Sequence, residues 1–285
     1  MSLECSAERV TNLPWANLRL PPFPQVALRV LQLVNNENVQ LHQWAELIGS
    51  DPAFASEVLS VVNSPLYALR YPATSIVQAV AVLGGNALQG MCITVGVRAY
   101  LGKTMAQPSM KSLWRHNLAC AIIAQRLAGN GPLDKGVAYT AGILHDIGRA
   151  ALSVIQPKEY ANLLAKHHGT AESLLEGERA LFGWDHCETG LQLITGWKLP
   201  KEFEAVIAEH HALSNPTAGW TMGELIKVSC RMADSLGFPA FSGCDSEPFE
   251  ELLACLPAEA ASRLNLDVVE VHTQLAEAIH AIELV

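Results

Sequence analysis

Apolar residues recur every three or four positions along most of the chain. This spacing covers residues 25–34, 41–48, 52–62, 76–83, 86–100, 109–127 and 135–144, and it returns over 200–211, 222–236, 249–256 and 268–282. Apolar positions at i, i+3, i+4 and i+7 place one face of an α-helix against a core. Because no sustained strand-like alternation and no hairpin signal interrupt the series, the pattern predicts an all-α fold.

Helix-start signals and breaks divide the chain. Asp51 before Pro52 is an N-cap followed by proline at the first helical position. Asp185 with Glu188 is an N-cap with its partner three residues on. Residues 102–108 break the helical pattern, so we expect two packed helical subdomains. The predicted boundaries are a tail over 1–17, an N-terminal subdomain over 18–105, a second subdomain over 106–240 and C-terminal helices over 241–285.

Composition narrows the choice of partners and location. The 285 residues are 50% hydrophobic and 16% charged, with a formal net charge of -9 and no cluster of Lys and Arg. Proteins that bind nucleic acid need such clusters, so we expect no nucleic-acid partner. Seven cysteines occur singly without a C-x-x-C pair, which fits reduced thiols in a cytoplasmic protein. No apolar run reaches the roughly 18 residues that span a bilayer, so we expect no membrane partner.

The dipeptide His145-Asp146 offers two metal ligands from adjacent residues. Other candidate ligands lie in or at the ends of apolar helical segments: His116, His186, His210, His211 and Asp234. Buried imidazoles and carboxylates are costly without partners, and a shared cation satisfies several at once. This donor set suits one or two divalent ions, Fe, Mn, Zn, Ni or, with fewer histidines, Mg. A single histidine on an apolar face is more often a core residue, and the histidines at 42, 167, 168, 272 and 280 are assigned to ordinary structural positions.

The order of these motifs resembles the HD superfamily of metal-dependent phosphohydrolases. The series is Leu113-Trp-Arg-His116, Ala141-Gly-Ile-Leu-His145-Asp146-Ile-Gly-Arg149, Asp185-His186-Cys-Glu-Thr-Gly190, Glu209-His210-His211 and Arg231-Met-Ala-Asp234. The prolines at 21, 22 and 24, Asp51-Pro52 and Val62-Asn-Ser-Pro-Leu-Tyr67 resemble the HDOD branch, the HD-related output domains of bacterial signalling. The resemblance covers roughly residues 18 to 240.

The resemblance implies an all-α fold of two subdomains and a regulatory or scaffolding role. It also implies a first metal site of His116, His145, Asp146 and Asp234, and a second of His186, His210 and His211 with Asp146 bridging. Arg149 stands where the hydrolases usually carry lysine, and Ala212 follows His211 where the cyclic-di-GMP phosphodiesterases carry Gly-Tyr-Pro. Both departures favour a signalling output domain whose partners are other signalling proteins.

The alternative function is a metal-dependent phosphohydrolase acting on a nucleotide or cyclic nucleotide. In that case Asp146 and Arg149 are the catalytic candidates, and the guanidinium neutralises charge on the leaving phosphate. For the signalling reading, residues 63–72 form a candidate interaction loop with two tyrosines. The same loop could instead fold back on the core.

Overall fold

The computed structural model describes residues 23–34, 39–67, 69–129, 132–211, 220–264 and 267–283. These residues form helices and connecting segments, with no strand and one isolated bridge between Gly169 and Cys244. The predicted all-α fold is confirmed. No helix within these ranges is both long and apolar enough to cross a bilayer. The prolines at 21 and 22 lie outside the described residues.

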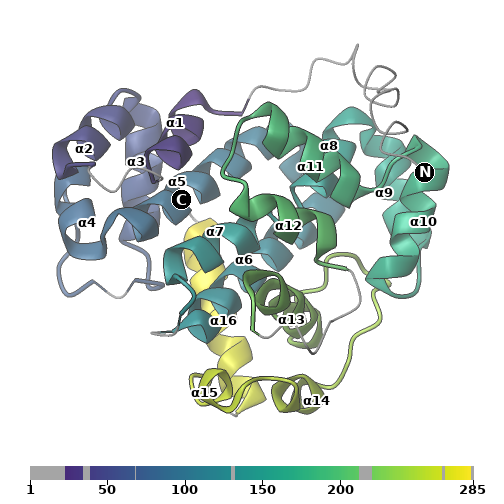
Figure 1. The fold of residues 1–285 in the computed structure, drawn as a ribbon. Helices are drawn as coiled ribbons and strands as arrows, with labels where there is room; N and C mark the ends of the chain where they lie inside the picture. The colour runs from purple at the N-terminus through teal and green to yellow at the C-terminus, as the bar shows by residue number, and fades with distance from the viewer. Residues whose placement is uncertain are drawn as a thin grey trace, which may run out of the picture.

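Most of the helices follow one another with short connections, while longer segments join α3 to α4 and α13 to α14 (Figure 1). Their bounds are α1 Gln25–Val34, α2 Leu41–Gly49, α3 Pro52–Val62, α4 Ile76–Leu83, α5 Gly85–Leu101, the 3-10 helix η3 Gly102–Ala106, α6 Pro108–Ala128, α7 Lys135–Leu144 and α8 Ile147–Ile155. They continue with α9 Pro157–Lys166, α10 Ala171–Phe182, α11 His186–Gly196, α12 Glu202–Glu209, α13 Met222–Ser235, α14 Phe249–Ala254, α15 Ala258–Ala261 and α16 Val268–Glu283.

The N-terminal helices gather around α5, which is buried on most of its surface. Helices α1, α3 and α4 pack against α5, and α2 packs against α4. Asp51 caps α3 as predicted, because its carboxylate accepts from the amides of Ala53 and Phe54 at 3.1 Å. The candidate loop after α3 is folded back by Asn63, whose side chain bonds both backbone groups of Ala73. Tyr71 in that loop is nevertheless 70% exposed.

Helix α6 is the centre of the second helical group. It packs against α7 and α13, and α7 also packs against α5, so α7 joins the two groups. The buried hydroxyls of Thr94 on α5 and Tyr139 on α7 bond at 3.0 Å across this contact. Buried apolar side chains form one core from Phe23 to Ile282. The predicted break at 102–108 contains η3, while the subdomain boundaries themselves stay predictions.

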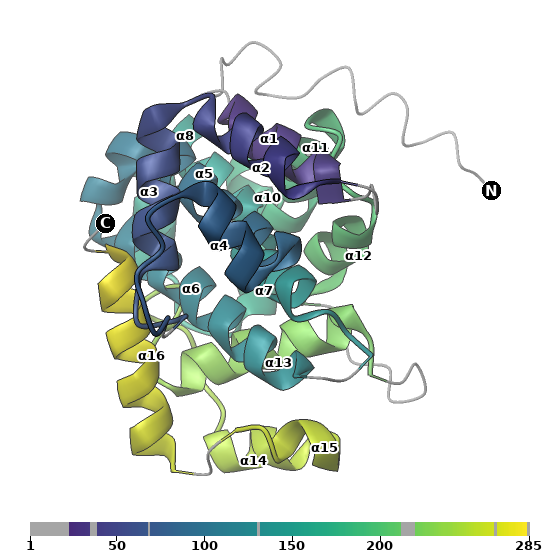
Figure 2. The same cartoon turned by 90° about the vertical axis from the view of Figure 1, so that its left-hand side faces the viewer.

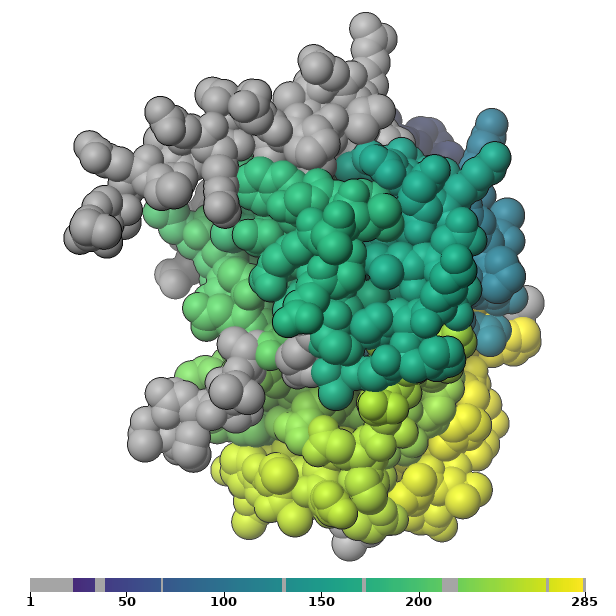
Figure 3. All heavy atoms as spheres, turned by 90° about the vertical axis from the view of Figure 1, so that its right-hand side faces the viewer, coloured from purple at the N-terminus to yellow at the C-terminus, as the bar shows by residue number. Residues whose placement is uncertain are grey.

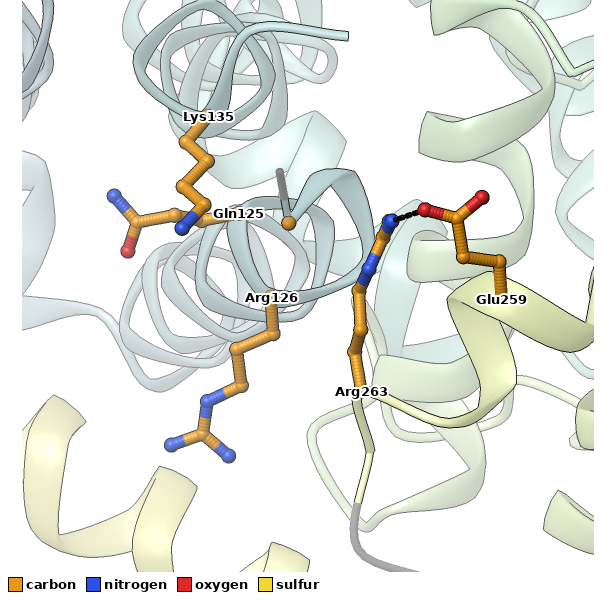
Figure 4. A pocket seen from close by; sticks show the side chains of 6 residues that line it. Gln125, Arg126, Lys135, Glu259 and Arg263 are labelled. Atoms are coloured by element: carbon orange, nitrogen blue, oxygen red, sulfur yellow. Dashed lines mark hydrogen bonds and ion pairs between the residues drawn. The ribbon is translucent and has the colours of Figure 1, made fainter. Parts of the chain in front are cut away.

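The C-terminal helices cover the outside of this second group. Helix α16 runs beside α6 and α3 (Figure 2), and the yellow-green C-terminal segment lies below the teal and green helices on the face in Figure 3. Arg263, after α15, donates to the carbonyls of Leu127 and Ala128 at the end of α6 and pairs with Glu259 (Figure 4). This arginine caps an otherwise unsatisfied helix end beside an open pocket of about 650 Å³.

Candidate metal centre

The centre is built around the turn between α7 and α8. His145 ends α7, and Asp146 sits in the turn with φ -101° and ψ 19° before α8 begins. The Asp146 carboxylate does not cap α8, so it is free to face inward. The other helices converge on this turn: α6 brings His116, α11 brings His186, α12 ends at His210 with His211 next, and α13 brings Cys230 and Asp234.

Gly148 allows α8 and α11 to approach closely enough to place His186 beside Asp146. A Cβ atom at Gly148 would lie 1.8 Å from the carbonyl oxygen of His186 and 2.7 Å from the amide nitrogen of Gly190. Any larger residue would therefore separate the two helices. The distance between Asp146 Oδ1 and His186 Nε2 is 3.4 Å.

Four candidate ligands meet on what we call the Arg149 side: Asp146, His186, His210 and His211. One atom from each lies within 4.8 Å of the others. His210 Nε2 is 3.2 Å from Asp146 Oδ1, and His186 Nε2 is 3.0 Å from His211 Nε2. The donor set of three imidazoles and one carboxylate is one that binds divalent transition metals.

Arg149 already supplies a positive charge to this side. Its guanidinium is 1% exposed, its Nε donates to Asp146 Oδ1 at 2.9 Å, and one terminal nitrogen lies 3.3 Å from His211 Nε2. The guanidinium carbon lies 5.8 Å from the centre of the Phe241 ring. Burial alone would raise the pKa of Asp146. Arg149 and the neighbouring histidines outweigh burial and hold this pKa well below its usual range. Asp146 is therefore a carboxylate at neutral pH.

Three donors meet on the opposite side, called the Cys230 side: His116, His145 and Cys230. Cys230 Sγ lies 3.3 Å from His116 Nε2, and all three side chains are buried. The centres of the His116 and His145 rings are 5.4 Å apart. Burial, above all, lowers the pKa of His145 to about 3, so this imidazole is neutral and keeps a lone pair.

Hydrogen bonds at the far nitrogens orient the rings. The Nδ1 atoms of His116, His145 and His210 lie 2.7–3.0 Å from the backbone carbonyls of Phe238, Gly142 and Ile207. His186 Nδ1 lies 2.6 Å from Glu178, which also accepts from the His186 amide and from the Tyr160 hydroxyl. With Nδ1 donating outward, each Nε2 faces the centre, which is the arrangement that fixes metal-binding histidines.

The structure places Asp234 outside both groups. Its Oδ1 is 3.2 Å from His116 Nδ1, which is the nitrogen turned away from Cys230. The same oxygen accepts from the amide of Ala240 at 3.3 Å. In this geometry Asp234 orients His116, and its assignment as a direct ligand stays a prediction.

Two buried polar atoms without hydrogen-bond partners indicate whether a cation fits the centre. His145 Nε2 and Asp146 Oδ2 are buried and have no hydrogen-bond partner, and they lie 3.6 Å apart. Both atoms are acceptors here, because His145 donates through Nδ1 and the carboxylate is ionised. Buried polar atoms are rarely left unpaired, so a divalent cation is a suitable partner for this pair.

A family model for the HDOD domain matches residues 20–213, more than half of the chain. The chain belongs to the HDOD family. An uncharacterized protein of Treponema pallidum is 27% identical over 199 residues, which are 68% of this chain and 38% of that protein. The HDOD chain thus spans well under half the length of this curated relative.

Solved structures share the fold. An HDOD domain protein with unknown function from Geobacter sulfurreducens is 24% identical, with a TM-score of 0.71 and coverage of 93% and 92% of the two chains. A Shewanella amazonensis protein, described as a candidate metal-dependent phosphohydrolase, is 22% identical, with a TM-score of 0.66 and coverage of 97% and 96%. At these identities the likeness shows the fold alone.

Sequence reasoning missed two residues of the HDOD centre. Cys230 was counted among the reduced thiols and not among the candidate ligands, although it lies four residues before Asp234 and thus on the same face of α13. Glu178 lies in α10, eight residues before His186 but outside the recognised motifs, and no local signal marked it. The remaining histidines agree with their structural assignment: His42, His168, His272 and His280 are exposed, and His167 bonds Ser173.

Proposed function

We propose that this chain is an output module of bacterial-type signal transduction whose second helical group is built around a buried divalent-metal centre. The observation that carries the proposal is the inward convergence of histidine Nε2 atoms around Asp146, with the outer nitrogens already bonded. A cation there would tie five helices together, and the surface of the assembled module would contact other signalling proteins. The metal then serves structure or sensing rather than turnover.

Burial supports this role over catalysis. His116, His145, Asp146 and His186 are fully buried, and His210 is 3% exposed. These residues have little or no contact with solvent, whereas His211 of the same cluster is partly exposed. Arg149 also bonds the carboxylate that would otherwise be open to a ligand. A centre enclosed in this way suits a fixed ion better than an exchanging substrate.

A second candidate function is metal-dependent hydrolysis of a nucleotide or cyclic nucleotide. The observation that favours it is the buried Arg149 Nη1, which has no hydrogen-bond partner beside Asp146 and could bond a phosphoryl oxygen. A divalent ion bound at the centre would supply Lewis acidity toward such an oxygen. Asp146 would hold the ion while Arg149 offset the charge of the phosphate.

Metal content and turnover together test both functions. The purified protein is analysed for metals and assayed with bis-p-nitrophenyl phosphate and cyclic dinucleotides, beside His145→Ala. A stoichiometric metal without turnover supports the module, provided that His145→Ala loses the metal. Turnover that His145→Ala abolishes establishes the hydrolase instead. Failure to bind any divalent ion, even after addition, overturns both.

A further inference from the structure

The Cys230 side offers a donor set that differs from the histidine and carboxylate set expected from the motifs. A sulfur atom, rather than the oxygen of Asp234, stands beside the two imidazoles. The three donors are within 4.8 Å of one another and buried. Sulfur and imidazole nitrogen together favour Zn²⁺ and other thiophilic ions, whereas Mg²⁺ and Mn²⁺ favour oxygen.

The hydrogen bonds of both rings leave the correct atoms facing the sulfur. His116 is held through Nδ1 by the carbonyl of Phe238 at 2.9 Å and by Asp234. His145 is held through Nδ1 by the carbonyl of Gly142 at 2.7 Å. Each ring therefore presents Nε2 toward the centre, and His145 Nε2 has no other partner.

Charge distinguishes the two sides of the centre. On the Arg149 side a guanidinium already bonds Asp146 Oδ1. On the Cys230 side, among the residues that the structure describes, no lysine or arginine bonds any of the three donors. The free oxygen of Asp146, Oδ2, is the one that lies 3.6 Å from His145 Nε2. An added cation therefore meets no directly bonded guanidinium on this side.

We propose that Cys230 is a metal ligand and that, together with His116 and His145, it holds a single thiophilic divalent ion such as Zn²⁺. The inference rests on the proposed function in one respect, namely that the centre binds a metal. Asp146 Oδ2 is the nearest further donor. Asp234 acts as a positioning residue through His116.

Cobalt substitution provides a direct readout of the sulfur ligand. Metal-free protein is titrated with Co²⁺, and the near-ultraviolet thiolate-to-cobalt charge-transfer band is recorded. We expect the band in the wild type and in Cys187→Ser, and its loss in Cys230→Ser. Cys187 is the matched control, because it is also a buried cysteine but lies outside both donor groups, with its Sγ 3.9 Å from His210 Nδ1, the nitrogen turned away from the centre.

A measurement on the wild type alone tests the sulfur ligand even if Cys230→Ser does not fold. X-ray absorption at the zinc edge of the Zn²⁺ protein should show one sulfur neighbour at about 2.3 Å. A zinc ion with only nitrogen and oxygen neighbours, or a charge-transfer band that survives in Cys230→Ser, overturns the inference but leaves the proposed function intact. Failure of the wild type to bind Zn²⁺ or Co²⁺ overturns the inference, and failure to bind any divalent ion overturns the proposed function as well.

Discussion

The Arg149 side and the Cys230 side share the His145-Asp146 turn but differ in the positive charge that they already carry. Against the effect of burial, Glu178 raises the pKa of His186 to about 10, and Cys187 and Asp146 raise that of His210 to about 9. Both imidazoles are therefore protonated at neutral pH in the metal-free chain. On the Cys230 side burial leaves His145 neutral. Against the effect of burial, Cys230 and Asp234 raise the pKa of His116 well above its usual value, so this side carries one protonated imidazole and no bonded guanidinium.

This difference shows that two groups of similar ligand residues can differ in how much a bound metal would stabilise them. On the Arg149 side two protonated imidazoles and a guanidinium face the carboxylates of Asp146 and Glu178. A metal would have to displace a proton from each of these two imidazoles, against one from His116 on the Cys230 side. On the Cys230 side the lone pair of His145 Nε2 has no hydrogen-bond donor. The comparison predicts one ion, and the following changes test it from the largest effect to the smallest.

Replacing Arg149 by Met should have the largest effect on stability. The change leaves the buried Asp146 carboxylate without its directly bonded guanidinium, and breaking a buried ion pair in this way costs about 3–5 kcal/mol. Urea unfolding of the metal-free protein measures the loss. The control is Arg231→Met, because the Arg231–Glu247 pair is 41% and 47% exposed and such surface pairs contribute about 1 kcal/mol or less.

The same variant also tests the number of ions. Without the guanidinium, Asp146 Oδ1 becomes available to a second cation, so Zn²⁺ bound at saturation should rise from one to two per chain. Equilibrium dialysis followed by metal analysis gives the count. Two ions in the wild type would mean that Arg149 does not occupy the place of a cation.

Gly148→Ala should disturb the Arg149 side through packing alone. The new Cβ would meet the His186 carbonyl at 1.8 Å, so α8 and α11 must separate, at a cost of about 3 kcal/mol. Thermal unfolding measures the effect. Gly223→Ala is the control, because its Cβ would meet only the Thr221 hydroxyl at 3.8 Å. Equal losses in the two variants would argue against the close crossing.

Glu178→Gln should remove the charged hydrogen bond between Glu178 and His186. We expect the free energy of unfolding to fall by about 2 kcal/mol, the value of a buried charged hydrogen bond. Burial raises the pKa of Glu178, but His186 outweighs it and holds that pKa below 4.5. A lowered folded-state pKa contributes stability above 4.5 that is lost as the pH falls through the folded value. As the pH is lowered from 6, the free energy of unfolding should therefore fall more steeply in the wild type than in the variant. Parallel curves for the two proteins would contradict this assignment.

Local sequence signals predicted most of the helical framework. Caps such as Asp51 and Asp185 have one local solution, and the apolar stripes determine which face is buried. Helix α8 was not predicted, because its start at Ile147 follows the His145-Asp146 turn with no proline or side-chain cap. The motif order found the residues of the Arg149 side, since they belong to recognisable sequence patterns.

The details that decide the chemistry could not be predicted. Which nitrogen of His116 faces inward depends on the Phe238 carbonyl, which is 122 positions away in the chain. Cys230 and Asp234 lie one turn apart on the same face of α13. Which of them reaches the centre therefore depends on how far α13 is shifted along its axis against α6. For the hydrolase alternative, Arg149 is the candidate to neutralise a leaving phosphate, and no sequence signal indicated that its Nε also bonds Asp146.

Asp234→Asn should have the smallest effect and separates the two roles of this residue. As a positioning residue, Asp234 shares the Nδ1 hydrogen of His116 with the Phe238 carbonyl, so the ring keeps its orientation after the change. Loss of such an outer partner lowers metal affinity by about 10-fold.

The cobalt charge-transfer band should persist in Asp234→Asn, and competition with a chelating indicator measures its affinity. Asp245→Asn, an exposed change in the segment after α13, should leave the affinity unchanged. If Asp234 were a direct ligand, its replacement would weaken binding by much more than 10-fold and would alter the visible cobalt spectrum. The size of the loss and the spectrum together therefore decide whether α13 contributes a sulfur or an oxygen to the ion.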